Sequence, residues 1–202
     1  MADIQDYAYL AANFCRNVPR FTFERAFVNA ARVYFKQTHA WQSTIKLSVK
    51  AGKAEYAIDT LEDDAEIESI ISVADDTRYL PANNFIPVVT RSEKPTSHYA
   101  RSKRSIGLNP VPKEDATYTV VIASKPILEA KVIEDEVFND NAEGLIHGAV
   151  MQLKMMGGTT WHDPQMAAYY ENEFEKCITE KRIELMHGQN NAELHIQYPN
   201  FI

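Results

Sequence analysis

At both ends of the chain, apolar residues recur every three or four positions, the spacing of one face of an α-helix. This spacing predicts a short helix over 3–14 and a longer amphipathic helix over 21–38. Two more helices are predicted over 141–156 and 164–187, the last with Asp163 as its N-cap and proline at its first position. The longer N-terminal helix has a broad apolar stripe: Phe23, Phe27, Ala30, Ala31, Tyr34 and Phe35.

From Trp41 onwards the apolar period falls to two, which is typical of strands with one buried face. The polar stretch over 90–103 interrupts this pattern and predicts a loop. The expected β-rich segments are 44–49, 55–58, 66–73, 78–80, 104–108 and 117–123.

A run of strands bracketed by helices indicates the α+β class. We predict a helical bundle of two N-terminal and two C-terminal helices, with an inserted antiparallel β subdomain and an extended C-terminal arm. The predicted parts are 1–41 for the N-terminal helices, 42–125 for the inserted β subdomain, 126–188 for the helical hairpin that completes the bundle, and 189–202 for the arm.

The net charge and the cysteine content each argue against particular classes of protein. The formal net charge of −7 argues against a dedicated nucleic-acid binder, which needs a dense basic face. Cys15 and Cys177 are far apart, so neither a disulfide framework nor a thiolate metal site is expected. The acidic cluster over 134–143 is interpreted as a solvated helix entry. No signal peptide is expected, because the N-terminus lacks a basic region followed by an apolar core. No membrane span is expected, because no apolar run approaches about 20 residues.

No nucleophile motif or phosphate-cradling loop is found in the sequence. The nearest approach to a metal motif is Trp161-His162-Asp163, with His147 and His187 elsewhere, but paired histidines four residues apart are missing. We interpret Trp161 as packing and Asp163 as a helix cap. The prediction is therefore no enzyme, no catalytic residue, no metal and no cofactor, with a small hydrolase that uses His162 and Asp163 as a weaker alternative.

The polar stretch over 90–103 is locally basic, although the chain as a whole is acidic. It predicts a contact with an acidic surface, either a neighbouring subunit or the DNA backbone, and the alternative is a solvated loop beside a strand. Its cations are Arg91, Lys94, Arg101, Lys103 and Arg104, against the single acid Glu93.

The C-terminal arm contains several large apolar residues, a single acid, Glu193, and no lysine or arginine. Its alternating pattern predicts an extended strand, which either closes its own sheet or docks on a partner through strand addition and aromatic anchors. The predicted docking residues are Leu194, Ile196, Tyr198, Phe201 and Ile202.

Short motifs in a fixed order cover almost the whole chain. They are Cys-Arg-Asn-Val-Pro over 15–19, Thr-His-Ala-Trp over 38–41, Leu-Asn-Pro-Val-Pro over 108–112 and Trp-His-Asp-Pro over 161–164. In this order they resemble the head-to-tail adaptor (connector or neck) proteins of tailed bacteriophages. One departure is Thr-Ser-His-Tyr over 96–99, where a Gly-Pro-like turn is expected.

The resemblance implies a virion protein of the neck, assembled in the host cytoplasm. Copies would form a ring, expected to be a dodecamer, beneath the portal protein, with the arm docked on the portal. The ring would extend the DNA channel, pass genomic DNA without reading its sequence, and offer a platform to tail (nozzle or tube) proteins. The alternatives are a tail-tube or neck-completion protein that never contacts the portal, and an effector-binding module.

Overall fold

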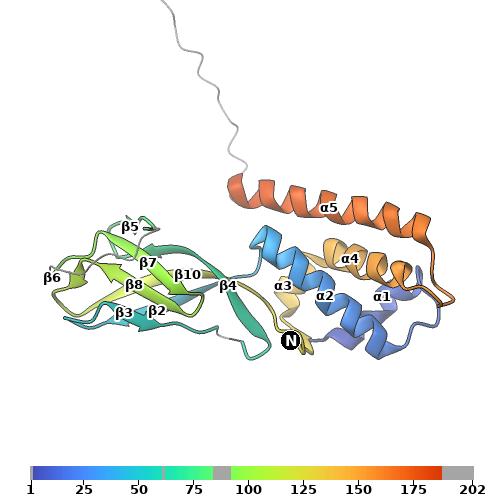
Figure 1. Cartoon of the computed structure of the whole chain (residues 1–202), viewed down its shortest axis with the longest axis horizontal. Helices are drawn as coiled ribbons and strands as arrows, with labels where there is room; N and C mark the ends of the chain where they lie inside the picture. The colour runs from blue at the N-terminus through green and yellow to red at the C-terminus, as the bar shows by residue number, and fades with distance from the viewer. Residues whose placement is uncertain (1, 61, 84–91, 188–202) are drawn as a thin grey trace, which may run out of the picture.

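The computed structural model describes residues 2–60, 62–83 and 92–187. Within these residues, most strands gather at one end of an elongated molecule and the helices at the other (Figure 1). The mixed α and β content confirms this part of the predicted α+β class. The arrangement as a bundle with an inserted subdomain over 42–125 stays a prediction.

The described helices are the 3₁₀ helix η1 (Ile4–Tyr7) and the α-helices α1 (Ala8–Ala12), α2 (Arg20–Thr38), α3 (Asp135–Asn139), α4 (Ala142–Met155) and α5 (Pro164–His187). Three predicted helices match α2, α4 and α5 to within one residue at each end. The first prediction is less accurate, because 3–14 contains a 3₁₀ turn and only a short α-helix. Asp3 accepts the backbone N–H of Gln5 at 2.9 Å and so caps that 3₁₀ turn.

The main sheet has the order β2-β10-β4-β5 and is antiparallel throughout. Its strands are β2 (Gln42–Val49), β10 (Ala116–Pro126), β4 (Ala65–Ala74) and β5 (Tyr79–Leu80). Val120 of the central strand β10 lies opposite Ile45 of β2 and Val73 of β4. Side chains of these strands therefore share one apolar face, as the alternating pattern predicts.

The remaining strands form smaller sheets. Strands β3 (Glu55–Ala57), β8 (Ser105–Asn109) and β7 (Ser97–Ser102) form an antiparallel sheet in the order β3-β8-β7. Two further pairs join distant segments: β1 (Ala2–Asp3) with β11 (Val132–Ile133), and β6 (Ser92–Glu93) with β9 (Val111–Pro112), the latter parallel.

The predicted loop over 90–103 is wrong for most of its described part, which forms β6 and β7. Buried His98 and Tyr99 are adjacent, so the strand lacks the alternation that sequence reasoning looks for. The His98 backbone N–H donates to the Pro81 carbonyl at 3.0 Å. The Tyr99 ring lies on Gly107 of β8, where a Cβ atom would come within 2.1 Å of the ring. Only glycine leaves room for this ring.

Two apolar cores result. The core of the helical half, by which we mean η1, α1, α2, α3, α4 and α5, is rich in large aromatic side chains, among them Phe23, Phe27, Phe35 and Trp41. The core of the strand half, meaning β2 to β10, is mainly aliphatic, with Ile106, Leu108, Val120 and Ile122 fully buried.

Small residues let helix α4 approach its neighbours closely. A Cβ atom on Gly144 would come within 2.5 Å of the Tyr34 ring and 3.2 Å of the Cys177 Cβ atom. A Cβ atom on Gly148 would come within 2.7 Å of the Phe174 ring. These two glycines thus set how near α2 and α5 lie to α4.

A polar network joins the two halves. The guanidinium of Arg32 on α2 donates to the Pro126 carbonyl at 2.5 Å and to Glu66 of β4 at 2.9 Å. Lys125 of β10 pairs with Glu68 of β4 at 2.6 Å and with Glu66 at 3.5 Å. The Lys125 and Glu68 side chains are only 12% and 11% exposed. We call these residues the junction network.

Candidate functional site

The predicted docking arm lies outside the residues that the structure describes, and so do Leu194, Ile196, Tyr198, Phe201 and Ile202. The described chain ends with α5 at His187. Ile183 and Met186 in the last turns of α5 are exposed apolar side chains. Docking by the arm therefore stays a prediction.

Three of the predicted contact cations lie beside acids of the same half of the molecule. Lys94 pairs with Asp75 at 3.0 Å, and Arg101 pairs with Glu55 at 3.0 Å. Lys103 pairs with Glu68 at 2.8 Å, which extends the junction network. Arg104 is exposed, and Arg91 lies outside the described residues. Much of the local positive charge is thus balanced within the chain, and a role in subunit or DNA contact stays a prediction.

Asp75 is held in its charged form by hydrogen bonds from the turn that follows β4. It accepts the side-chain hydroxyl of Thr77 at 2.7 Å, and the backbone N–H groups of Thr77 and Arg78 at 2.8 Å each. These hydrogen bonds, first those from Thr77 and then one from Lys94, hold the pKa of Asp75 far below its ordinary value. Asp75 therefore organises the turn between β4 and β5.

The Trp161-His162-Asp163 segment serves the fold. Asp163 accepts the Met166 backbone N–H at 3.1 Å, which confirms its predicted role as a helix cap. The His162 Nδ1 atom lies 3.1 Å from the Lys154 carbonyl, which can only accept, so Nδ1 donates. Trp161 packs against the core of the helical half. His162 and Asp163 each engage backbone groups, so the hydrolase alternative gains no support from their geometry.

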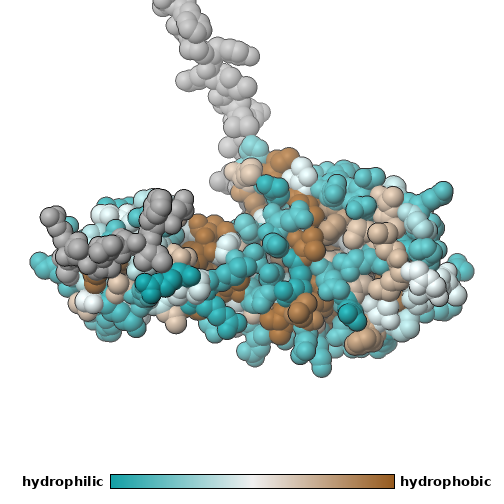
Figure 2. Space-filling model, viewed as in Figure 1, coloured by the Kyte–Doolittle hydropathy of each residue, from teal (hydrophilic) through white to brown (hydrophobic). Residues whose placement is uncertain are grey.

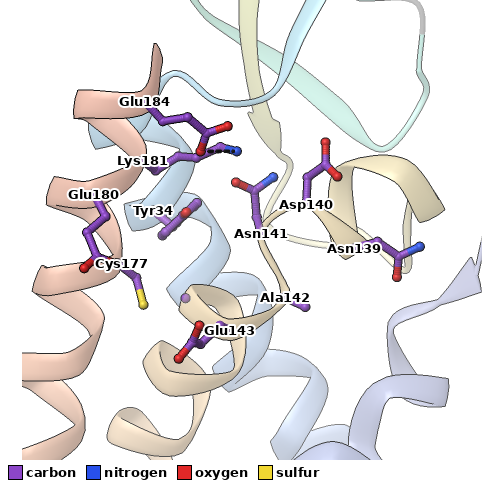
Figure 3. A pocket seen from close by; sticks show the side chains of 11 residues that line it. Tyr34, Asn139, Asp140, Asn141, Ala142, Glu143, Cys177, Glu180, Lys181 and Glu184 are labelled. Atoms are coloured by element: carbon purple, nitrogen blue, oxygen red, sulfur yellow. Dashed lines mark ion pairs between the residues drawn. The ribbon is translucent and has the colours of Figure 1, made fainter. Parts of the chain in front are cut away.

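An acidic pocket of about 320 Å³ lies between the start of α4 and the second half of α5 (Figure 3). Among its described lining residues, Lys181 is the only lysine or arginine, and it pairs with Glu184 at 3.0 Å. The acids that line the pocket are Asp140, Glu143, Glu180 and Glu184. Figure 3 shows Glu143 and Cys177 approaching each other from facing helices.

Two residues that line this pocket, Glu143 and Cys177, also lie close to the imidazole of His147, so a carboxylate, an imidazole and a thiol come together here. Glu143 and His147 are one helical turn apart on α4, and Cys177 faces them from α5. Burial, followed by the negative charge of Glu143, raises the pKa of the Cys177 thiol. Sequence reasoning missed this cluster. The four-residue spacing of Glu143 and His147 was readable, but the contact with Cys177 depends on how α5 lies along α4.

The predicted contact cations and Asp163 use their polar side chains in ion pairs and a helix cap, as is typical of a structural protein. Residues 2–194 match the family model described as SU10 adaptor protein. The chain therefore belongs to the SU10 adaptor protein family, which confirms the resemblance to phage head-to-tail adaptors. No curated protein matches the sequence.

Family membership makes the chain a structural adaptor of a bacteriophage and places it in the virion. Proteins of this class are normally not enzymes, in agreement with the prediction from the sequence. Among the described helices, none is both long and apolar enough to cross a bilayer.

Proposed function

We propose that the chain is the head-to-tail adaptor that forms a ring beneath the portal protein, continues the DNA channel and provides a platform for tail proteins. The observation that carries this proposal is the family match, which spans residues 2–194 and thus nearly the whole chain. A dodecamer is the expected ring.

The charge distribution supports passage of DNA without retention. The chain has a formal net charge of −7, and Lys94, Arg101 and Lys103 are paired with acids of the same chain. Strong attachment to DNA requires free cations that displace counterions from phosphates. A ring of such subunits would therefore offer little attraction to the genome as it moves through.

The shape supports a role between two partners. The helical half and the strand half lie at opposite ends of the molecule (Figure 1), so one end can face the portal and the other the tail. Figure 2 shows apolar patches on an otherwise largely hydrophilic face. Large exposed apolar side chains are present on both halves, namely Tyr79 on the strand half and Phe21, Met155 and Met186 on the helical half.

We further propose that the arm over 189–202 docks on the portal. Deleting residues 188–202 removes the arm and keeps all of α5, so the truncated chain should remain folded by circular dichroism. It should no longer co-sediment with purified portal rings, whereas the full chain should. If the truncated chain still co-sediments, the arm is not the docking element.

Alternation within the arm provides a matched control. Tyr198→Ala with Ile196→Ala removes two side chains of one face of the predicted strand, and His195→Ala with Gln197→Ala removes two of the other. The first pair should weaken co-sedimentation at least about tenfold, as loss of aromatic anchors does. The second pair should leave it nearly unchanged. Equal losses from both pairs would contradict strand-like docking.

The same material separates the adaptor from a tail-tube or neck-completion protein. Native mass spectrometry of the chain alone, and of the chain with portal rings, reports which ring forms and with what partner. If the chain forms rings by itself and these rings do not bind the portal, the neck-completion alternative is favoured and the adaptor proposal is overturned.

A further inference from the structure

Glu143, His147 and Cys177 form a compact set of metal-ligand groups. One carboxylate oxygen, one imidazole nitrogen and the thiol sulfur all lie within 4.8 Å of one another. The His147 Nδ1 atom is 4.0 Å from the Cys177 Sγ atom. In a tetrahedral site with bonds of about 2.0–2.3 Å, neighbouring ligand atoms lie about 3.3–3.8 Å apart. Small rotations of these side chains are therefore enough to enclose a cation.

The backbone positions that make this cluster are fixed by packing. Glu143 and His147 are separated by one turn of α4, so their side chains leave the helix on the same side. Gly144 stands between them and lets α5 approach, since its missing Cβ atom would lie 3.2 Å from the Cys177 Cβ atom. The His147 ring also contacts the Tyr170 ring, with 5.6 Å between centroids. Two of the three ligands thus come from one rigid helix and the third from its closest partner.

The surroundings favour a cation. Glu180 lines the same pocket as Glu143 and Cys177, and with Glu173 it adds to the negative field at the thiol. Lys176 is the cation that opposes this field. A divalent ion would neutralise part of the acidic charge that now gathers between α4 and α5.

We propose that Glu143, His147 and Cys177 bind one divalent cation of the zinc type, and that water occupies the fourth position. A mixed set of oxygen, nitrogen and sulfur donors suits zinc and cobalt, whereas magnesium and calcium prefer oxygen alone. On binding, the Cys177 thiol releases its proton to solvent and the thiolate becomes the ligand, while His147 binds through a neutral ring nitrogen.

The proposed ion would join the first two turns of α4 to the second half of α5. It would thereby hold α5 against α4. This role is independent of the proposed ring and of docking on the portal, so it can be tested on the isolated chain.

Cobalt(II) is the probe, because thiolate coordination to cobalt gives a charge-transfer absorption in the near ultraviolet. The full chain, kept reduced with a phosphine, is titrated with cobalt and then with zinc. We expect the absorption to saturate at one cobalt per chain and to disappear as zinc displaces cobalt. Magnesium should not compete. Absence of the absorption in the wild-type chain would overturn the proposal.

Matched variants assign the ligands. Cys177→Ser should abolish the absorption, whereas Cys15→Ser, which alters the buried thiol at the other end of the chain, should keep it. Glu143→Gln and His147→Gln should each weaken cobalt binding by at least about tenfold, a loss within the range seen even for groups that only support metal ligands. Glu171→Gln on α5 should bind like the wild type. Circular dichroism verifies that every variant is folded.

The results for these variants can overturn the proposed metal site in two ways. Retention of the absorption in Cys177→Ser, or its loss in Cys15→Ser, would place the metal elsewhere and overturn the site. If cobalt binds Glu143→Gln and His147→Gln as tightly as the wild type, the absorption comes from the Cys177 thiol alone. This result would also overturn the proposed site.

Discussion

The helical half and the strand half of this protein are held together in different ways. In the helical half, large rings such as Phe27 and Phe35 fill the space between helices, and glycines on α4 set the helix spacing. In the strand half, smaller aliphatic side chains fill the core, and ion pairs such as Lys125 with Glu68 link the neighbouring strands β10 and β4. The stability of the helical half depends mainly on how well large side chains fill its core, whereas the stability of the strand half also depends on ion pairs. Different substitutions should therefore break each half.

The largest effect is expected from removing an aromatic side chain in the helical half. Phe27 is 0% exposed, so Phe27→Ala should lower the free energy of unfolding by about 3–5 kcal/mol, measured by urea denaturation. Phe21→Ala, on the same helix at a side chain that is 72% exposed, should change it by less than about 0.5 kcal/mol.

Phe27→Ala also tests whether residues 42–125 fold as an inserted unit, as we propose. If they do, amide hydrogen exchange should increase in α2 and α4 while β10 keeps most of its protection. An equal loss of protection in both halves would show that the halves unfold together.

An intermediate effect is expected in the strand half from closing the space under Tyr99. In Gly107→Ala the new methyl group would meet the Tyr99 ring, which must move, and the free energy of unfolding should fall by about 1–3 kcal/mol. Gly157→Ala is the control, because nothing lies within 4 Å of its added Cβ atom. If the two variants are equally stable, the ring does not pack on Gly107 in solution.

The smallest effect is expected from the junction network and depends on pH. Burial opposes ionisation of Glu68, but hydrogen bonds from Lys103 and Lys125 outweigh it and lower the pKa of the carboxyl group. A lowered pKa stabilises the fold above the ordinary glutamate pKa of about 4.3, and this stability is lost as the pH falls through the folded-state value. Glu68→Gln should therefore cost about 1 kcal/mol at neutral pH and progressively less below about pH 4.

Thermal unfolding of wild type and Glu68→Gln across this pH range measures the difference. Exposed Glu129→Gln is the control and should change stability by no more than about 0.5 kcal/mol at any pH. A constant difference between wild type and Glu68→Gln down to acid pH would mean that ionisation of Glu68 does not contribute.

The helices could be predicted because the residues that specify each helix are close together in the sequence. The apolar stripe of α2 and the Asp163-Pro164 start of α5 specify each helix from residues within a few turns, and the bounds agree to within a residue. Strands β2 and β10 were also readable, since their apolar residues alternate.

What the sequence could not provide depends on contacts between distant segments. Strand β7 has adjacent buried residues, and its burial depends on Gly107 and on the carbonyl of Pro81. Lys94 and Arg101 suggested a free basic surface, but their partners Asp75 and Glu55 lie far away in the sequence. The cluster around Cys177 was missed for the same reason: helical spacing predicts which residues share a face, and not which helix faces them.

Helix α5 continues well beyond its last buried residue. Ile178 is the last buried side chain, yet the helix runs on to His187, about 13 Å further along its axis. Ile183 and Met186 are carried on this extension and are exposed. Ordering a flexible segment costs about 1–2 kcal/mol per residue in backbone entropy. Here that entropy is already lost when the chain folds, so a partner that covers Ile183 and Met186 meets a preorganised surface and can bind it quickly and with little ordering cost.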